Sequence, residues 1–290
     1  MKKILILIPV FNDWESLKKL ISEIDENIDN TNDAVFECII LNDASTINQP
    51  EIVKPKNFKS FKVLNMKKNQ GHARCNAFGI RFATQNEIFD YLILMDGDGE
   101  DRPIEIKGLL EAIKKDPNTS VVAKRIKRSE GPFFQMLYFG HKVLTYIFTG
   151  KKINFGNYSC LTKKDVEILS SKPSLWSSYS GTVKRNIKKL SEINSIRGAR
   201  YFGPSQMSFF KLLIHSFSII AVFKYQVFLR SLLLILFLTF IKKHLGILSL
   251  ILQILILIFN FLILIVSFRE NKEDLFKSQE NLKNVKRITH

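Results

Sequence analysis

A short apolar run that ends in a dense group of acids is the feature that most constrains this 290-residue chain. Residues Tyr91–Met95 are apolar, and residues 96–101, with the sequence DGDGED, follow directly. The run is too short for a helix and is bounded by turn residues, so it predicts a buried strand. Asp96 and Asp98 lie two residues apart, which places both carboxylates on one side of an extended backbone. Negative charge crowded at the end of a buried strand is costly unless a cation neutralises it.

The acidic segment supports two interpretations. Hard divalent ions such as Mg²⁺ or Mn²⁺ prefer carboxylate oxygens and often share them with substrate phosphates, which predicts a metal site at Asp96 and Asp98. The alternative is a solvated acidic loop that only caps the strand. A D-x-D pattern alone does not separate the two, so the decision depends on the rest of the chain.

Strand and helix patterns alternate through the first half of the sequence. We expect strands at 3–10, 36–41, 61–64, 91–95 and 120–123, and helices at 14–28, 69–83 and 103–115. Asn12 or Asp13 is expected to cap the first helix. The alternation predicts an α/β domain with a mainly parallel sheet. Because ligands bind beyond the carboxyl ends of such strands, Phe11, Asp43 and Asp96 are expected to meet in one crevice.

The C-terminal quarter has a different character. Residues 245–268 contain no charged side chain, and at 1.5 Å per residue they are long enough to cross a bilayer. A shorter apolar stretch at 225–241 predicts a transmembrane hairpin with the turn at 242–246; the alternative is one spanning helix plus one interfacial helix. The aromatic-rich residues 132–148 are expected to be interfacial helices. The tail, 269–290, is expected to be helical and to lie at the membrane surface.

The net charge of +16 points to an anionic partner. The positive charge is spread along the chain up to the membrane segment, which excludes a nucleic-acid binder in favour of anionic lipid or a phosphate-rich substrate. Three scattered cysteines, Cys38, Cys75 and Cys160, favour a reducing compartment over a disulfide framework. We therefore expect an integral membrane protein with its soluble domain in the cytoplasm. The sequence leaves the oligomeric state open, and a homo-oligomer is compatible with it.

Four motifs resemble those of family 2 glycosyltransferases in order and spacing: Ile8-Pro9-Val10-Phe11-Asn12, Asn42-Asp43-Ala44-Ser45, Asn69-Gln70-Gly71-His72-Ala73-Arg74 and the acidic residues 96–101. The resemblance covers about residues 3–210 and is nearest to the polyprenyl-phosphate sugar synthases of the dolichol-phosphate mannose synthase type. It implies a GT-A-type, Rossmann-like α/β domain at 1–210, a membrane segment at 211–268 and a charged tail at 269–290.

The resemblance also implies roles for individual residues. The family usually has two acids where this chain has Asn42-Asp43, so the first contact with the base differs, and Glu100 stands where relatives often have a glutamine ligand. Arg125 matches an arginine that contacts phosphate. Residues 200–207 resemble an acceptor-side segment in which Gln206 replaces a lysine, and Lys142 is a further candidate for acceptor phosphate. The implied sets are Asp96, Asp98 and Arg125 for catalysis; Pro9, Phe11, Asn12, Asp43 and Asp96 for the nucleotide; Asp96, Asp98 and Glu100 for Mg²⁺ or Mn²⁺; and Arg200, Ser205 and Lys142 for acceptor phosphate.

The acceptor is inferred from what the residues lack. A hydroxyl acceptor needs a general base, yet residues 168–191 contain no Asp or Glu, which leaves Asp101 as the candidate base. A phosphate monoester is already ionised near neutral pH and needs none. The sequence therefore predicts inverting transfer of a sugar from a nucleotide-sugar to a polyprenyl phosphate. The alternatives are direct transfer to a lipid-linked or surface glycan, and an inactive binding protein with this fold.

Overall fold

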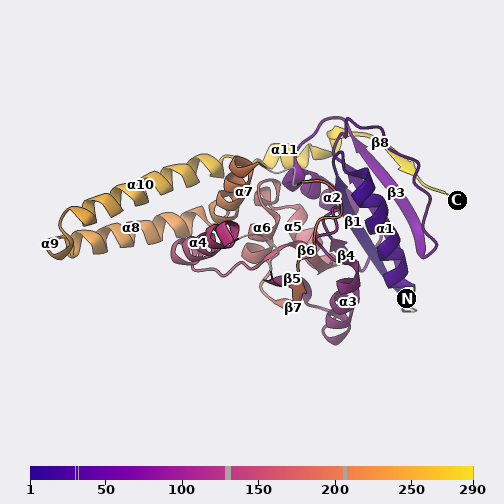
Figure 1. Ribbon diagram of the computed structural model, residues 1–290, viewed down its shortest axis with the longest axis horizontal. Coiled ribbons are helices and arrows are strands. Elements are labelled where there is room, and N and C mark those ends of the chain that lie inside the picture. Colours follow the sequence, from indigo (N-terminus) through magenta and orange to yellow (C-terminus); the bar gives the residue numbers. More distant parts are fainter. Residues whose placement is uncertain (30, 32, 128–131, 205–207, 290) are drawn as a thin grey trace.

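The computed structural model describes residues 1–29, 31, 33–127, 132–204 and 208–289, which form an α/β domain from which a helical hairpin projects (Figure 1). One eight-stranded sheet has the order β7-β5-β6-β4-β1-β2-β3-β8. Its strands are β1 (Lys2–Val10), β2 (Ala34–Asn42), β3 (Phe58–Met66), β4 (Tyr91–Leu94), β5 (Ser120–Lys127), β6 (Phe155–Thr162), β7 (Leu190–Ile196) and β8 (Leu282–Arg287).

Helices cover both faces of the sheet, as the alternating pattern predicted. Leu5 and Leu7 of β1 pack in one core cluster with residues of α2, whereas Ile4 and Ile6 pack in the other cluster with residues of α1 and α3. Successive strand residues point to opposite faces, so a continuous aliphatic strand serves both cores. The helices of this domain are α1 (Trp14–Ile28), α2 (His72–Asn86), α3 (Ile106–Lys115, preceded by the 3₁₀ turn Pro103–Glu105), α4 (Pro132–Thr149), α5 (Lys163–Ser170) and α6 (Tyr179–Asn186).

The sheet is mostly parallel, which confirms the predicted fold class. Strands β3, β2, β1 and β4 run parallel, and β5 runs parallel to β7. Strand β6 lies antiparallel between β4 and β5, and β8 lies antiparallel on the edge of β3. The sequence did not predict β6, β7 or β8, because each pairs with a strand distant in the chain and lacks a clear periodic pattern.

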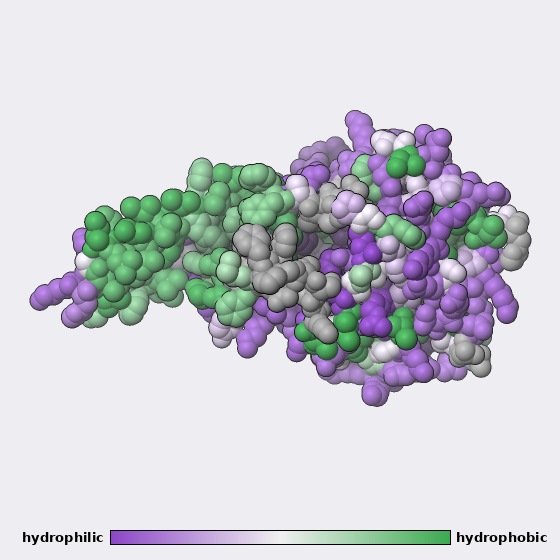
Figure 2. All heavy atoms as spheres, in the orientation of Figure 1, coloured by the Kyte–Doolittle hydropathy of each residue, from purple (hydrophilic) through white to green (hydrophobic). Residues whose placement is uncertain are grey.

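The C-terminal helices form the expected hairpin (Figure 1). After α7 (Phe209–Ala221) come α8 (Lys224–Phe240), the short α9 (Lys242–Leu245) at the tip, and α10 (Ile247–Ser267), which packs along α8. Figure 2 shows the hairpin as an apolar arm beside a polar domain. Among the described residues, one helical stretch, Ile247–Phe276, is long and apolar enough to cross a membrane; α7 and α8 pass the same test only together, with an 85° bend between them.

The tail differs from the expectation. Residues 269–290 were expected to be helical and at the membrane surface, but only α11 (Lys272–Phe276) and a 3₁₀ turn (Ser278–Asn281) are helical there. Strand β8 then adds to the edge of β3, with Asn284 opposite Asn65. The prediction of a helical surface tail was wrong because an open sheet edge offers backbone partners that the local sequence does not reveal.

Candidate functional site

The loops after β1 and β2 are joined by the side chain of Asn12. Its Oδ1 accepts hydrogen bonds from the backbone N–H groups of Thr46 (2.8 Å) and Ile47 (3.1 Å), and its own N–H donates to Oγ of Ser45 at 3.0 Å. Asn12 has a φ of 57°, in the left-handed region that asparagine tolerates better than most residues. It therefore does not cap α1, and Asp13, the residue before α1, makes no side-chain capping bond either. The expected cap was wrong because Asn12 binds the neighbouring loop instead.

Asp43 is buried at the end of β2, where both of its oxygens are used. Oδ1 accepts from the N–H of Gln70 and Oδ2 from the N–H of Gly71, each at 2.8 Å. Burial raises the pKa of Asp43, and the two backbone hydrogen bonds partly offset that effect. The structure thus assigns Asp43 the task of fixing the loop before α2, while its predicted contact with ribose stays a prediction.

Asp96 lies among three polar groups from different elements. Its Oδ1 is 2.9 Å from Nε2 of His72, the first residue of α2, and accepts from Nδ2 of Asn157 on β6 at 3.0 Å. Burial alone would raise its pKa, but His72, Arg125 and Asn157 together hold the pKa of Asp96 below its usual range. Burial likewise opposes the charge on His72, yet the carboxylates of Asp96 and Asp98 outweigh burial and raise the pKa of the imidazole.

Asp98 is held by an arginine from a distant part of the chain. Arg200 donates from Nη1 to Oδ2 of Asp98 at 2.9 Å, and its Nη2 group pairs with Asp13 in the loop after β1. Burial first, and then the charges of Asp96 and Glu100, raise the pKa of Asp98 to about 6. Arg200, predicted to bind acceptor phosphate, therefore meets the predicted metal ligand directly.

The segment 197–201 lies along the acidic loop. Gly198 donates its N–H to the carbonyl of Glu100 at 2.8 Å, and Tyr201 donates its N–H to the carbonyl of Asp98 at 3.0 Å. Glu100, predicted as a metal ligand, forms an ion pair with Arg197 instead. Glu100 and Asp98 are thus each paired with an arginine of segment 197–201, and the assignment of Asp96, Asp98 and Glu100 as metal ligands stays a prediction.

Arg125 and Asp101 lie beneath the same loop. Asp101 is 3 % exposed and accepts from the N–H of Asp96 at 2.9 Å, while Nη2 of Arg125 lies 3.8 Å from its other oxygen. Burial and the nearby Asp96 raise the pKa of Asp101 to about 7, although Arg125 opposes that rise. Asp101 therefore supports the loop and lies beside Arg125, whose predicted contact with phosphate stays a prediction.

His215 is a partly buried residue of α7. Burial and the positive charges of His72, His141 and Arg125 together lower the pKa of His215 to about 4, although the negative charge of Asp96 opposes them. The imidazole is consequently neutral near pH 7.

The donor set fits a divalent ion that is completed by substrate. Asp96 and Asp98 supply carboxylate oxygens. The pKa of Asp98 is raised by burial and by the neighbouring carboxylates, and the pKa of Asp96 stays low because His72, Arg125 and Asn157 outweigh its burial. A cation would favour the charged form of both residues. Within the part of the chain that the structure describes, no three His, Cys, Asp or Glu side chains are gathered as a closed metal centre. Mg²⁺ commonly takes one or two carboxylates and shares the rest of its shell with substrate phosphates, which is the arrangement these residues allow.

Two other predicted residues add little to the geometry. Lys142 is half-buried on α4, the helix beside the hairpin, and Ser205 lies outside the described residues.

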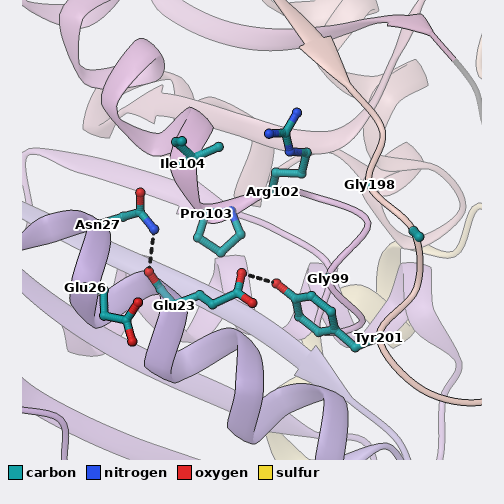
Figure 3. A pocket seen from close by; sticks show the side chains of 10 residues that line it. Glu23, Glu26, Asn27, Gly99, Arg102, Pro103, Ile104, Gly198 and Tyr201 are labelled. Atoms are coloured by element: carbon teal, nitrogen blue, oxygen red, sulfur yellow. Dashed lines mark hydrogen bonds between the residues drawn. The ribbon is translucent and has the colours of Figure 1, made fainter.

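A cavity of about 520 Å³ borders the outer side of the acidic loop, between α1 and segment 197–201 (Figure 3). There Tyr201 donates its hydroxyl to Glu23 at 2.5 Å, as the figure shows. The charged residues that line this cavity are Glu23, Glu26 and Arg102, so its net charge is negative and disfavours a phosphate ligand.

Sequence reasoning missed several residues of the site. The sequence assigned no role to His72 or to Asn157, although both contact Asp96. Asn157 contacts Asp96 because β6 pairs with β4, and the local sequence does not predict that pairing. Asp13 and Arg197 likewise gain their partners only through the approach of segment 197–201.

The domain has an open α/β sheet whose carboxyl ends carry acids, an arginine and a glycine-bounded loop. Such a domain suits a phosphate-bearing, nucleotide-like ligand. The sequence matches the profile described as glycosyl transferase family 2 over residues 5–167, and the chain belongs to that family. A curated relative, an uncharacterised protein of Methanocaldococcus jannaschii, is 26% identical over 120 residues, which are 40% of this chain. The match covers 48% of that protein, so the chain spans about half the length of this curated relative.

Solved structures share the fold at low identity. The mannosyltransferase PcManGT from Pyrobaculum calidifontis, in complex with GDP-mannose and Mn²⁺, is similar with a TM-score of 0.53 and 11% identity over 91% of this chain and 86% of that one. Mannosyl-3-phosphoglycerate synthase from Rubrobacter xylanophilus has a TM-score of 0.53 and 11% identity over 76% of this chain and 72% of that one. Glucosyl-3-phosphoglycerate synthase from Mycobacterium tuberculosis, in complex with Mn²⁺, UDP-glucose and phosphoglyceric acid, has a TM-score of 0.51 and 15% identity over 78% of this chain and 80% of that one. At these identities the likeness shows the fold alone.

Proposed function

We propose that this protein is a membrane-anchored, inverting glycosyltransferase that moves a sugar from a nucleotide-sugar to a polyprenyl phosphate. The observation that carries the proposal is the position of α7 between the α/β domain and the apolar hairpin. Ile219 of α7 packs in a core cluster of the domain with Trp176 and Tyr179. Its neighbour Ile220 packs with Val227 and Ile263 of the hairpin. A lipid-borne acceptor would therefore meet the donor at the root of the hairpin.

The donor half of the proposal rests on family membership and on the carboxylates. Asp96 and Asp98 would hold a Mg²⁺ or Mn²⁺ ion, as expected by analogy with similar structures that contain Mn²⁺. The ion would act as a Lewis acid toward the departing diphosphate. Arg125 would add a fixed positive charge beside the leaving phosphates. His72 and Asn157 hold Asp96 in one orientation, and Arg200 holds Asp98.

The proposed membrane anchoring rests on the hairpin. Only 11% of the most apolar window of Ile247–Phe276 is buried, whereas a core helix would be mostly covered. The rings of Phe148 on α4 and Phe259 on α10, with centroids 4.4 Å apart, join the hairpin to the domain. The ion pair of Lys224 with Glu270 at 3.0 Å joins the two ends of the hairpin to each other. We place the catalytic domain on the cytoplasmic side, because Cys38, Cys75 and Cys160 are all unpaired thiols.

The acceptor half rests on the shortage of a strong base. Both oxygens of Asp101 face other groups of the loop, so this residue is poorly placed to accept a substrate proton. A phosphate acceptor avoids the need. His215 favours the second candidate, direct transfer to a glycan hydroxyl, because a neutral imidazole can accept a proton; its lowered pKa, however, makes it a weak base.

The test is transfer from a panel of radiolabelled nucleotide-sugars by the full-length protein in native membranes, with a polyprenyl phosphate or an oligosaccharide as acceptor. Label in the lipid extract supports the proposal, and label only in the oligosaccharide supports the alternative. Asp98→Asn should lower transfer more than 100-fold, as expected for loss of a metal ligand. Asp116→Asn is the matched control and should not, because Asp116 lies at the C-terminal end of α3 in a surface ion pair with Lys189. Transfer that survives Asp98→Asn would contradict the proposed site.

A further inference from the structure

Two long segments of the sequence contain no acidic residue. No Asp or Glu occurs at residues 131–164 or at residues 193–269. These segments include α4, α7, α8 and α10, and they also carry lysines and arginines. A basic side chain there finds a carboxylate only outside them, as Lys224 does in its ion pair with Glu270. Uncompensated positive charge beside a membrane is matched by anionic lipid headgroups.

Arg230 interrupts an apolar surface of α8. This helix contains two charged residues, Lys224 at its first position and Arg230, about 9 Å further along its axis. Leu229 and Leu233, on either side of Arg230 in the sequence, are both more than half exposed. A charged side chain among such residues in a bilayer is costly unless it reaches water or an anion.

The guanidinium of Arg230 lies at the C-terminal end of α4. Its Nη1 group donates to the carbonyl of Ile147 at 3.1 Å. Its Nη2 group lies against Gly150, where an added Cβ would be 2.4 Å away. Gly150 ends the helix with a φ of +69°, and its N–H donates to the carbonyl of Tyr146 at 2.8 Å. The partial negative charge of the helix end thus holds the guanidinium in place.

Most of the donors of this guanidinium remain available. A guanidinium has five N–H groups. Within the part of the chain that the structure describes, Arg230 makes the one hydrogen bond to Ile147 and no ion pair. Its side chain is exposed, so a ligand from outside the protein can reach the other N–H groups.

Two lysines and a tyrosine extend the positive surface around Gly150. Lys151 and Lys152 follow it directly, and both are exposed. Nζ of Lys152 lies 5.6 Å from the centre of the Tyr146 ring, which is itself exposed. Tyrosine is common at membrane–water boundaries, because its ring is apolar and its hydroxyl is polar. An arginine fork with lysine charges beside it suits a phosphate group.

The surroundings favour a phosphate that carries acyl chains. Ile147 of α4 and Leu233 of α8 are exposed apolar residues that flank the site. Side chains incline toward the N-terminus of their helix, so Arg230 reaches back toward Lys224 and away from the tip of the hairpin. Helix α4 packs against α8 where the apolar arm meets the polar domain (Figures 1 and 2). That boundary is the level of the phosphate groups when the hairpin lies in a bilayer.

We propose that Arg230 and the C-terminal end of α4 bind the phosphate group of an anionic phospholipid, in the leaflet that faces the α/β domain. Lys151 and Lys152 add positive charge around it, and the phosphate bridges α4 and α8. The site shares no residue with the crevice around Asp96 and Asp98. The inference rests on the proposed function, since a lipid reaches Arg230 only where the hairpin is in a membrane.

The test is titration of the full-length protein in detergent micelles with phosphatidylglycerol and with phosphatidylcholine, followed by native mass spectrometry. We expect one phosphatidylglycerol to bind at least about tenfold tighter than phosphatidylcholine. Arg230→Gln removes the guanidinium and should weaken phosphatidylglycerol binding about tenfold. Lys243→Gln, at the exposed tip of the same hairpin, removes an equal charge and should leave this affinity unchanged.

A second variant keeps the contact with Ile147, which Arg230→Gln removes. The double variant Lys151→Gln, Lys152→Gln takes away two exposed charges beside the site. It should weaken phosphatidylglycerol binding at least about threefold and leave the melting temperature of the lipid-free protein unchanged. Affinity equal to that of the wild type in this variant or in Arg230→Gln would overturn the inference.

The remaining outcomes separate the sources of the phosphate. Equal affinity of the wild type for the two lipids, or equal losses in Lys243→Gln and Arg230→Gln, would overturn the inference, because either shows unspecific attraction. Displacement of phosphatidylglycerol by an equal concentration of polyprenyl phosphate would assign the site to the acceptor, and displacement by inorganic phosphate would assign it to a soluble anion; each result overturns the inference. Absence of sugar transfer with phosphatidylglycerol binding intact would overturn the proposed function alone.

Discussion

Arg200 donates a hydrogen bond from Nη1 to Oδ2 of Asp98 at 2.9 Å and so places a guanidinium on a carboxylate proposed to bind a divalent ion. Both side chains are about one-fifth exposed or less. The same arginine pairs with Asp13 in the loop after β1, which links the acidic loop, the first loop of the sheet and segment 197–201. A cation that binds Asp98 must share or displace this arginine.

The first prediction concerns this competition. Arg200→Gln removes a positive charge beside Asp98, so Mn²⁺ should bind the nucleotide-free protein about tenfold more tightly. Sugar transfer should nevertheless fall, because the acidic loop loses the side-chain bridge through Arg200 to Asp13 in the loop after β1. Titration with Mn²⁺ by electron paramagnetic resonance and a transfer assay measure the two effects separately.

A matched control for Arg200→Gln is Lys189→Gln, which breaks an exposed ion pair with Asp116. This variant should change neither Mn²⁺ affinity nor transfer. Weaker Mn²⁺ binding in Arg200→Gln would show that Arg200 supports the metal site and does not compete with it.

Local patterns predicted the strands that carry the site but not the contacts between them. Val10, Asn42 and Leu94 end strands whose apolar runs are visible in the sequence, so the convergence of their loops followed from the parallel arrangement alone. The partners of Asp96 and Asp98 depend on tertiary contacts instead. Asn157 reaches Asp96 because β6 is inserted antiparallel beside β4, and Arg200 reaches Asp98 across about a hundred residues of sequence.

The C-terminal tail also shows that local sequence patterns do not predict contacts between distant parts of the chain. Residues 269–290 have mixed charge and no clear period of apolar residues, which by itself favours a solvated helix. The exposed edge of β3 supplied the competing interaction, because unpaired backbone groups on a sheet edge accept a further strand. Sequence reasoning therefore predicted the strands that precede the candidate site and missed β8 altogether.

A second prediction concerns the buried carboxylate of Asp43. Asp43→Asn keeps the shape of the side chain but leaves one of the N–H groups of Gln70 and Gly71 facing another N–H group. The free energy of unfolding should fall by about 1–3 kcal/mol, the cost of an unsatisfied buried donor. Chemical unfolding of the detergent-solubilised protein, followed by tryptophan fluorescence, measures it. Equal stability of Asp43→Asn and the wild type would show that the loop before α2 is held by other contacts.

A third prediction separates two effects that favour glycine at position 99, the backbone conformation and the close contact with Tyr201. This residue has a φ of +88°, and an added Cβ would lie 2.4 Å from the ring of Tyr201. Gly99→Ala should therefore lower stability through backbone strain of about 1–2 kcal/mol and through displacement of Tyr201. In a double-mutant cycle, the Tyr201→Ala background should remove the loss of stability caused by displacement of Tyr201 and should keep the loss caused by backbone strain. Strict additivity in unfolding experiments would show that the Tyr201 ring does not restrict this position.

The last prediction tests the membrane hairpin. Leu255 lies near the middle of α10 and Leu233 lies in α8, and both are more than half exposed. If both helices span a bilayer, an arginine at either position should oppose insertion by about 3 kcal/mol. Resistance of the protein to alkaline extraction from membranes should then fall in Leu255→Arg and in Leu233→Arg. Ile88→Arg, at an exposed apolar residue of the α/β domain, should stay as resistant as the wild type. A loss in Leu255→Arg alone would support one spanning helix with α8 at the interface, because an arginine on an interfacial helix can reach water. Unchanged extraction in both hairpin variants would contradict membrane insertion and, with it, the proposed lipid acceptor.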